Sequence, residues 1–471
     1  MASDPAALSA TELLRRYRSK ALSPVETTRA VLDRIDRFDS AVNAFCLVDP
    51  DQALQSARGS ETRWQRGEPR GLVDGVPATI KDLVLTRGWP TLRGSLAIPR
   101  EQAWDEDGPA TARLREQGAV LIGKTTTPEF GWKAVTDCAL TGITRNPWDT
   151  GKTPGGSSGG AAAACALGMG ALHLGTDGGG SIRIPASFTG IFGLKPSFGR
   201  VPAWPLSPFG TVAHLGPMTR TVSDAALMLN VLALPDGRDW FALPYDGRDY
   251  RIGLEDGVRE LRIAFSPTLG FAAVEPEVAD LVARAALAFA DLGARVEQID
   301  LGFDDPIAVF RTHWSVGAAN LLRGFTGEQR AKMDPGLQEI GAAGESTPLI
   351  DYLAAVNRRG ELGARMRRFH ETFDLLMTPS VPIAAFAAGQ ERPDPARQPR
   401  WIDWAPFSAP FNLTQQPAAS IPCGLTAAGL PVGLQIVGPM FADALVLRAA
   451  RAFEAAHPWP LPEGPRVQEP A

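Results

Sequence analysis

The chain has 471 residues, of which 44% are hydrophobic and 21% charged, so it can bury a large core and wholesale disorder is excluded. A net charge of -5 provides no basic surface for phosphates, which argues against nucleic acid as a partner. The four cysteines lack the spacing of a zinc site or disulfide framework, and no apolar run is long enough to span a bilayer. We therefore expect a cytoplasmic protein without a membrane association.

The first half of the chain predicts an α/β arrangement. Residues 1–60 are predicted to be N-terminal helices, because Ser23, Pro24 and Glu26 have the pattern of a helix start. Short apolar runs then alternate with helical patterns. Strands are predicted over 78–84, 119–123 and 171–176, and helices over 111–117 and 160–167. This alternation is typical of a sheet with helices on its faces.

The second half is predicted to contain a long helical section and then to return to the sheet. Helices are predicted over 222–234, 275–292, much of 305–375 and 442–456, strands over 261–265, 418–423 and 429–437, and a polar loop over 388–400. With no internal repeat or linker, we expect one domain over 1–471. Its expected parts are the helices of 1–60, a catalytic core over 65–220, a peripheral, lid-like section over 225–375 and a return to the core over 376–460.

Two short motifs match known patterns without their structural context. Residues 118–125 fit the P-loop pattern, but their apolar run predicts a buried strand and not a phosphate-binding loop. Residues 155–159 contain G-x-S-x-G around Ser157, yet the preceding segment is coil where a nucleophile elbow needs a strand. An α/β-hydrolase-type esterase, in which Ser157 works with His457, remains a less favoured alternative.

A third constellation is more specific. Lys81 lies in an apolar strand, Ser157 and Ser158 lie in a Gly-Gly-Ser-Ser-Gly-Gly run, and three glycines precede Ser181. Glycines directly before a nucleophile leave backbone N–H groups free to stabilise a developing oxyanion. These residue types suit acyl transfer without histidine, with Ser181 attacking, Ser157 relaying its proton and Lys81 receiving it. Lys81 must then be neutral, which burial in the apolar strand favours.

The chain resembles the amidase signature family. The Ile-Lys81-Asp, Asn-Pro-Trp-Asp and Gly-Gly-Ser-Ser-Gly-Gly runs match its pattern, as do Gly-Gly-Ser181-Ile-Arg-x-Pro and the C-terminal Gly-Leu-Pro-Val-Gly-Leu-Gln. The resemblance implies a large mixed central β-sheet flanked by α-helices on both faces. It implies a Lys81, Ser157 and Ser181 triad, with a cis peptide bond before Ser157, and neither a metal nor an organic cofactor.

The resemblance also implies roles for neighbouring residues. The oxyanion donors would be the N–H groups of Gly178, Gly179, Gly180 and Ser181. Ser158, Asp177 and Arg183 would support the site. Gly131 and Trp132 would line the substrate pocket. From their aromatic character, and not from the resemblance, Trp314, Trp401, Trp404 and Phe407 are candidates for an aromatic wall of the site or for the core. Position 178 departs from the family, which often has threonine or a branched residue there, so a looser loop is expected.

The predicted function is hydrolysis of the C–N bond of a carboxylic amide, with an aryl or apolar acyl amide as the small-molecule partner. Esters and carbamates are further candidates, because the same acyl-enzyme forms from each. The alternative is the amidase (A) subunit of a glutamyl/aspartyl-tRNA amidotransferase, which acts within a complex. A catalytically silent binding protein is disfavoured by the intact Lys81, Ser157 and Ser181. A homodimer is compatible with all of these predictions.

Overall fold

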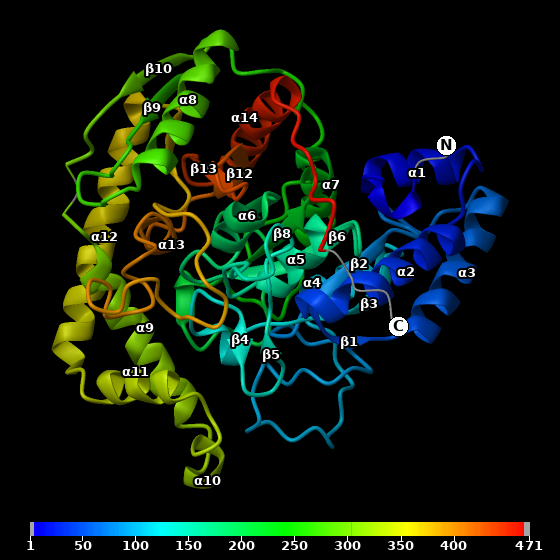
Figure 1. Cartoon of the computed structure of the whole chain (residues 1–471), viewed down its shortest axis with the longest axis horizontal. Coiled ribbons are helices and arrows are strands. Elements are labelled where there is room, and N and C mark those ends of the chain that lie inside the picture. The colour runs from blue at the N-terminus through cyan, green and yellow to red at the C-terminus, as the bar shows by residue number, and fades with distance from the viewer. Residues whose placement is uncertain (1–3, 303, 466–471) are drawn as a thin grey trace.

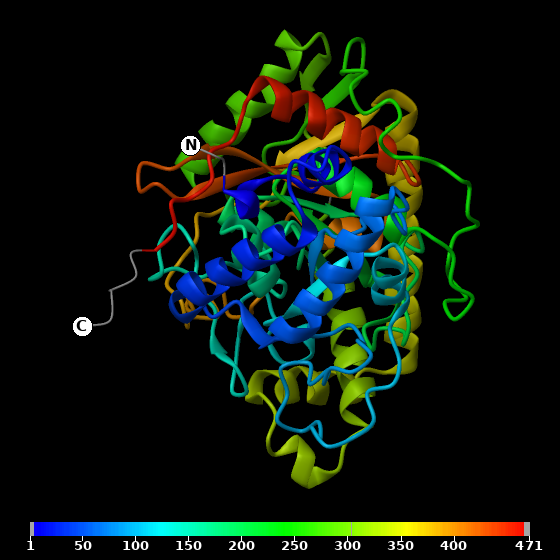
Figure 2. The same ribbon diagram turned by 90° about the vertical axis from the view of Figure 1, so that its right-hand side faces the viewer.

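The computed structural model describes residues 4–302 and 304–465 (Figures 1 and 2). The strands are β1 (Phe45–Val48), β2 (Pro77–Lys81), β3 (Val120–Thr125), β4 (Asp137–Cys138), β5 (Gly142–Ile143), β6 (Leu172–Asp177), β7 (Phe192–Lys195), β8 (His214–Thr219), β9 (Arg262–Phe265), β10 (Arg295–Gln298), β11 (Leu375–Pro379), β12 (Ala418–Leu425) and β13 (Pro431–Val437). The α-helices are α1 (Ala10–Arg18), α2 (Pro24–Val42), α3 (Pro50–Arg66), α4 (Pro109–Glu116), α5 (Gly159–Ala166), α6 (Arg183–Thr189), α7 (Val222–Leu232), α8 (Pro276–Asp291), α9 (Ile307–Leu322), α10 (Gly327–Arg330), α11 (Pro335–Glu345), α12 (Leu349–Thr372), α13 (Ala409–Leu413) and α14 (Asp443–Ala456).

An 11-stranded mixed sheet forms the centre of the described chain, in the order β1-β3-β2-β6-β8-β7-β12-β13-β11-β9-β10. β2 runs parallel to β3 and β6, and β9 runs parallel to β10 and β11. The remaining neighbours are antiparallel. The expected mixed α/β sheet is confirmed.

Helices cover both faces of this sheet. Successive side chains of a strand point to opposite faces, so each strand contributes residues to the cores on both sides. Leu121 of β3 packs into the core that includes α4, α7, α8 and α14, whereas Val120 and Ile122 pack against α2 and α5. In β11, Leu375 and Met377 likewise face the first core, and Leu376 faces α12 and α13. Strands buried on both faces read as continuous apolar runs, which is the pattern that the sequence shows.

The segment 225–375 has two distinct parts. Its first part, from α7 to β10, belongs to the central sheet and its covering helices. Its second part, α9 to α12, lies along one side of the molecule, opposite α1 to α3 (Figures 1 and 2). No helix in 4–302 or 304–465 combines the length and apolar character that crossing a membrane requires.

The sheet positions the candidate site at the carboxyl ends of β2 and β6. These parallel neighbours pair Ile80 with Leu174, so the strand ends lie at the same edge of the sheet. Lys81 is the last residue of β2 and Asp177 the last of β6. Ser157 and Ser158 directly precede α5, and Ser181 lies in the short loop between β6 and α6. Residues separated by 100 positions therefore meet at one edge.

Candidate active site

The amine of Lys81 lies among three hydroxyl groups. Its Nζ is 2.7 Å from Ser157 Oγ, 2.8 Å from Ser158 Oγ and 2.9 Å from Thr176 Oγ1. The Ser158 hydroxyl donates to the carbonyl of Thr176 (3.1 Å), so its oxygen must accept from Lys81. A neutral amine has two hydrogens and one lone pair, so it can donate to two of the hydroxyls and accept from the third. The arrangement therefore suits a lysine that takes a proton from Ser157.

Burial favours the neutral form of Lys81. The side chain is fully buried, and this burial lowers the pKa of the amine well below its ordinary value, although the charge of Asp177 opposes the change. The Gly156–Ser157 peptide bond is cis, as the resemblance implies. Ser157 itself is 1% exposed, so the proton path from its hydroxyl to Lys81 is shielded from bulk water.

The loop before Ser181 presents backbone N–H groups. In the described residues, the N–H groups of Gly178, Gly179 and Ser181 have no hydrogen-bond acceptor. Gly180, the other expected donor, differs: its N–H donates to Asp177 Oδ1 (2.8 Å). Its peptide is also held at the other end, because Ser408 Oγ donates to the Gly179 carbonyl (2.6 Å). The prediction for Gly180 as an oxyanion donor is therefore wrong in this structure, and Gly180 shapes the loop instead.

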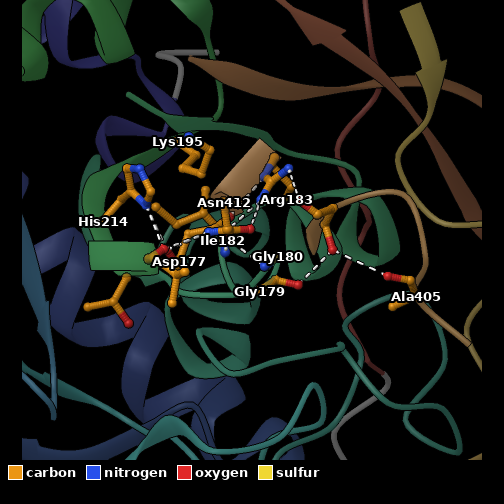
Figure 3. Close-up of polar contacts among 12 residues, drawn as sticks. Asp177, Gly179, Gly180, Ile182, Arg183, Lys195, His214, Ala405 and Asn412 are labelled. Carbon is orange, nitrogen blue, oxygen red and sulfur yellow. Dashed lines mark hydrogen bonds and ion pairs between the residues drawn. The ribbon is translucent and has the colours of Figure 1, made fainter. Parts of the chain in front are cut away.

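Asp177 and Arg183 hold this loop in place, in the supporting positions that the resemblance implies. Besides Gly180, the Asp177 carboxylate accepts from the N–H of Ile182 (3.2 Å) and from Arg183 Nε (3.0 Å) and Nη2 (2.9 Å) (Figure 3). Burial alone would raise the pKa of Asp177, but the charge and hydrogen bonds of Arg183 outweigh burial and keep it well below its ordinary value. The carboxylate is therefore charged, and it fixes the turn that leads into α6.

The C-terminal part of the chain completes the support. Arg183 donates to Asn412 Oδ1 (2.7 Å), Gln435 Oε1 (2.7 Å) and the carbonyl of Ser408 (3.1 Å). Asn412 in turn donates to Asp177 Oδ1 (2.9 Å) (Figure 3). This buried network joins the nucleophile loop to α13 and β13, and a fully bonded network of this kind restricts motion.

A cavity of about 230 Å³ opens onto the two serines. Ser157, Ser181 and Gly178 line it, whereas Lys81 lies behind Ser157, outside the lining. One wall is aromatic: the rings of Phe209 and Trp314 are stacked, with centroids 3.8 Å apart. A small apolar cavity with a few converging polar groups is typical of a ligand site.

Of the two residues after Phe130 that were expected to line the pocket, only one does so. Gly131 lines the cavity, and a Cβ at this position would lie 3.1 Å from Ser157 Oγ. Trp132 does not line it, so that prediction is wrong. Phe130 and Gly131 both have positive φ, and this turn directs Phe130 into the cavity and Trp132 against α11, where its ring packs on Gly336.

The four other aromatic candidates occupy either the cavity wall, the layer behind it or the core. Trp314 belongs to the cavity wall. Trp401 lies behind it, with ring centroids 5.5 Å apart. Trp404 is stacked on Phe188, and Phe407 packs under the sheet, so both are core residues.

Comparison with known proteins decides the family. The amidase family profile matches residues 26–447. An acylamidase of Rhodococcus erythropolis is 38% identical, with 96% of each chain covered. The glutamyl-tRNA(Gln) amidotransferase (A) subunit of Gloeobacter violaceus is 35% identical, over 95% of this chain and 96% of the relative. The crystal structure of a bacterial aryl acylamidase of the amidase signature family superposes with a TM-score of 0.89, at 34% identity and 96% coverage of both chains. The chain belongs to the amidase family.

Neither of the two competing motifs of this amidase has the structure that its pattern requires. In the P-loop-like segment, residues 120–125 form β3, and Lys124 is buried in an ion pair with Asp82 (Nζ–Oδ1 2.8 Å). No strand directly precedes Ser157, where an elbow would require one. His457 is exposed at the end of α14, and its described contacts are with Phe453. The serine-histidine alternative has no support in this geometry.

Some residues of the amidase site have no signal in the sequence. Thr176 is an ordinary strand residue until the register of β2 and β6 places it beside Lys81. Ser408 and Asn412 lie more than 220 positions from the loop that they hold. In the described residues, no cluster of three or more histidine, cysteine, aspartate or glutamate side chains is placed to hold a metal ion.

Proposed function

We propose that this amidase hydrolyses carboxylic amides with an aryl or apolar acyl group, through an acyl-enzyme on Ser181. The observation that carries the proposal is the buried Lys81 amine, 2.7 Å from Ser157 Oγ, in a setting that favours its neutral form. The aromatic wall of Phe209 and Trp314 supports an aryl or apolar substrate.

In the proposed reaction, Ser181 Oγ attacks the carbonyl carbon of the amide. Its proton passes to Ser157 Oγ as the proton of Ser157 passes to Lys81 Nζ. The negative oxygen of the tetrahedral intermediate accepts hydrogen bonds from the N–H groups of Gly178, Gly179 and Ser181, which supply the preorganised stabilisation that acyl transfer needs. The intermediate then collapses, the C–N bond breaks, and the relay returns the proton to the departing amine. A water molecule releases the acid by the same path.

The experiment is labelling of the purified chain with a fluorophosphonate, read by intact mass and peptide mapping. One adduct on Ser181 is expected, and Ser181→Ala should remove it. Ser197→Ala is the matched control: Ser197 also lines the cavity, but its hydroxyl donates to Asp443 (2.9 Å), so this variant should keep the adduct on Ser181. An adduct on Ser157 that persists in Ser181→Ala would contradict the proposal.

The amidotransferase subunit is the alternative function, and several such subunits are among the relatives. Two observations favour the independent amidase: the acylamidase is 38% identical against 35% for the subunit of Gloeobacter violaceus, and the aryl acylamidase structure superposes with a TM-score of 0.89 against 0.83 for the subunit from Thermotoga maritima. Turnover of an anilide by the chain alone would support the amidase, and turnover only in the presence of partner subunits would support the alternative.

We also propose that the chain works in the cytoplasm. All four cysteines are free thiols, which suits a reducing compartment. Fractionation of the source cells, followed by immunoblotting, would test this. A homodimer stays a prediction, for which sedimentation equilibrium is the measurement.

A further inference from the structure

The substrate cavity has one charged side chain without a partner. Of the described residues that line it, Arg93 and Asp239 carry charge, and burial lowers the pKa of the remaining titratable group, His214, so that it is neutral. The Asp239 carboxylate accepts from the N–H groups of Ala203 (2.8 Å) and Phe241 (2.9 Å). The Arg93 guanidinium, in contrast, has neither a hydrogen bond nor an ion pair within the described chain.

The backbone fixes Arg93 close to the serines. Its carbonyl accepts from the N–H of Phe130 (2.7 Å), and the next residue, Gly131, lies against Ser157. Arg93 also has a positive φ of 54°, a conformation that non-glycine residues rarely adopt and that is often associated with functional sites. The arginine is therefore held at the cavity wall by the same turn that forms the wall beside Ser157.

The surroundings of Arg93 have excess positive charge. Its neighbour Asp82 is already paired with Lys124 (2.8 Å), so one carboxylate faces two cations. Burial lowers the pKa of Arg93 and Asp82 opposes this, but a guanidinium stays charged in proteins. A half-buried cation without a partner is costly, and an anion in the cavity would offset that cost.

We propose that Arg93 binds a carboxylate of the substrate, so that the preferred amides of this enzyme carry a carboxylate group in addition to the amide. This rests on the proposed function and narrows its substrate class. The planar guanidinium donates in a fork that matches a carboxylate, and such a pair both attracts and orients the ligand. The apolar wall of Phe209 and Trp314 then holds the aryl or alkyl part, while Arg93 fixes the charged end.

The test compares anilides that differ only by the carboxylate. Succinanilate is paired with butyranilide, which places the charge on the acyl side. 4-Acetamidobenzoate is paired with 4-methylacetanilide, which places it on the amine side. In the parent enzyme, kcat/KM should be higher for the charged member of at least one pair. The pair that shows this preference identifies the side on which the carboxylate lies.

The variant Arg93→Met should lower kcat/KM for the preferred charged anilide by about tenfold to a hundredfold, and leave its neutral counterpart within about twofold. Arg93→Lys keeps the charge without the fork, so its loss should be smaller. Arg100→Met is the matched control, because it removes the same charge from the chain. Arg100 is exposed and does not line the cavity. Equal losses on both members of the pair, or no loss on either, would overturn the proposal.

A binding experiment separates this proposal from the proposed function. Calorimetry with Ser181→Ala, which cannot form the acyl-enzyme, measures binding of succinanilate and 4-acetamidobenzoate with and without Arg93→Met. Binding that depends on Arg93, in a parent chain that hydrolyses no anilide, would support the carboxylate site and contradict the amidase proposal. Hydrolysis of neutral anilides, with binding of the charged ones unaffected by Arg93→Met, would do the reverse.

Discussion

Gly178 leaves the space that the indole ring of Trp314 occupies. A Cβ at position 178 would lie 2.9 Å from Trp314 Cζ3, closer than real Cβ contacts, and 3.1 Å from Cη2, which is also a tight contact. The ring is not free to move away, because it is stacked on Phe209 and its Nε1 donates to the carbonyl of Trp132 (3.1 Å). The glycine at position 178 is thus matched by a tryptophan in the cavity wall, and this ring fills the space over the loop.

This relationship predicts a coupling between the two positions. Gly178→Thr should lower the free energy of unfolding by about 1–3 kcal/mol, because it overpacks the wall. In a Trp314→Ala background the same substitution should cost much less, since the ring is gone. Urea unfolding of the parent, both single variants and the double variant measures the coupling. Strictly additive effects would show that the contact does not constrain position 178.

The second prediction concerns the pH dependence of activity. Burial lowers the pKa of Lys81, and the relay needs the neutral amine, so kcat/KM should rise with pH through this lowered pKa. Lys81→Met should reduce kcat/KM by about 10²–10⁴-fold at every pH, since no other base remains. The control is Lys332→Met, an exposed lysine on the surface, which should leave the profile unchanged. A Lys81→Met variant with the parental profile would mean that another group takes the proton.

The same lysine predicts a pH-dependent stability. Between its lowered pKa in the folded chain and the ordinary value of 10.5, the unfolded chain binds a proton that the folded chain does not. Stability therefore increases with pH in this window. The unfolding free energy of the parent minus that of Lys81→Met should rise by up to about 1.4 kcal/mol per pH unit, as urea titrations at pH 7 and 9 would show. The difference cancels the contributions of other buried lysines, and a flat difference would indicate a charged Lys81.

The fourth prediction concerns the buried pair that holds the nucleophile loop. Arg183→Met leaves the Asp177 carboxylate buried without its cation, which should cost about 3–5 kcal/mol of unfolding free energy. The matched control is Arg251→Met, which breaks an exposed pair with Asp249 and should cost less than about 1 kcal/mol. Chemical denaturation of both variants makes the comparison. Similar small losses in the two would mean that the network around Asp177 tolerates the missing cation.

Local patterns predicted the centre of the site, and long-range contacts determined the rest. Lys81 ends an apolar strand and Ser181 follows three glycines, so the adjacent residues in the sequence already indicate the chemical role of each. Trp132 was predicted wrongly because the positive φ values at Phe130 and Gly131 exchange which side chain faces the cavity. Arg93 had no signal, because an arginine is ordinary in a sequence until its surroundings show that it lacks a partner.

The strands of the fold show the same contrast between local patterns and long-range contacts. The predicted strands of the parallel region are short apolar runs, and β2, β3 and β6 are confirmed near their predicted positions. β7, β8 and β10 had no such run, β1 was included in the N-terminal helices, and β11 was included in the helical section. Their extended conformation is stabilised by pairing with strands far away in the chain, which a local pattern does not contain.

The network around Arg183 also sets the order of events during synthesis. Ser181 and its glycine loop leave the ribosome early, but the partners that hold the loop, from Ser408 to Gln435, follow more than 220 residues later. A nascent chain therefore carries its nucleophile without the support that aligns it. We therefore expect the enzyme to become competent only after Gln435 has been synthesised, and copies that end before this residue to be inactive.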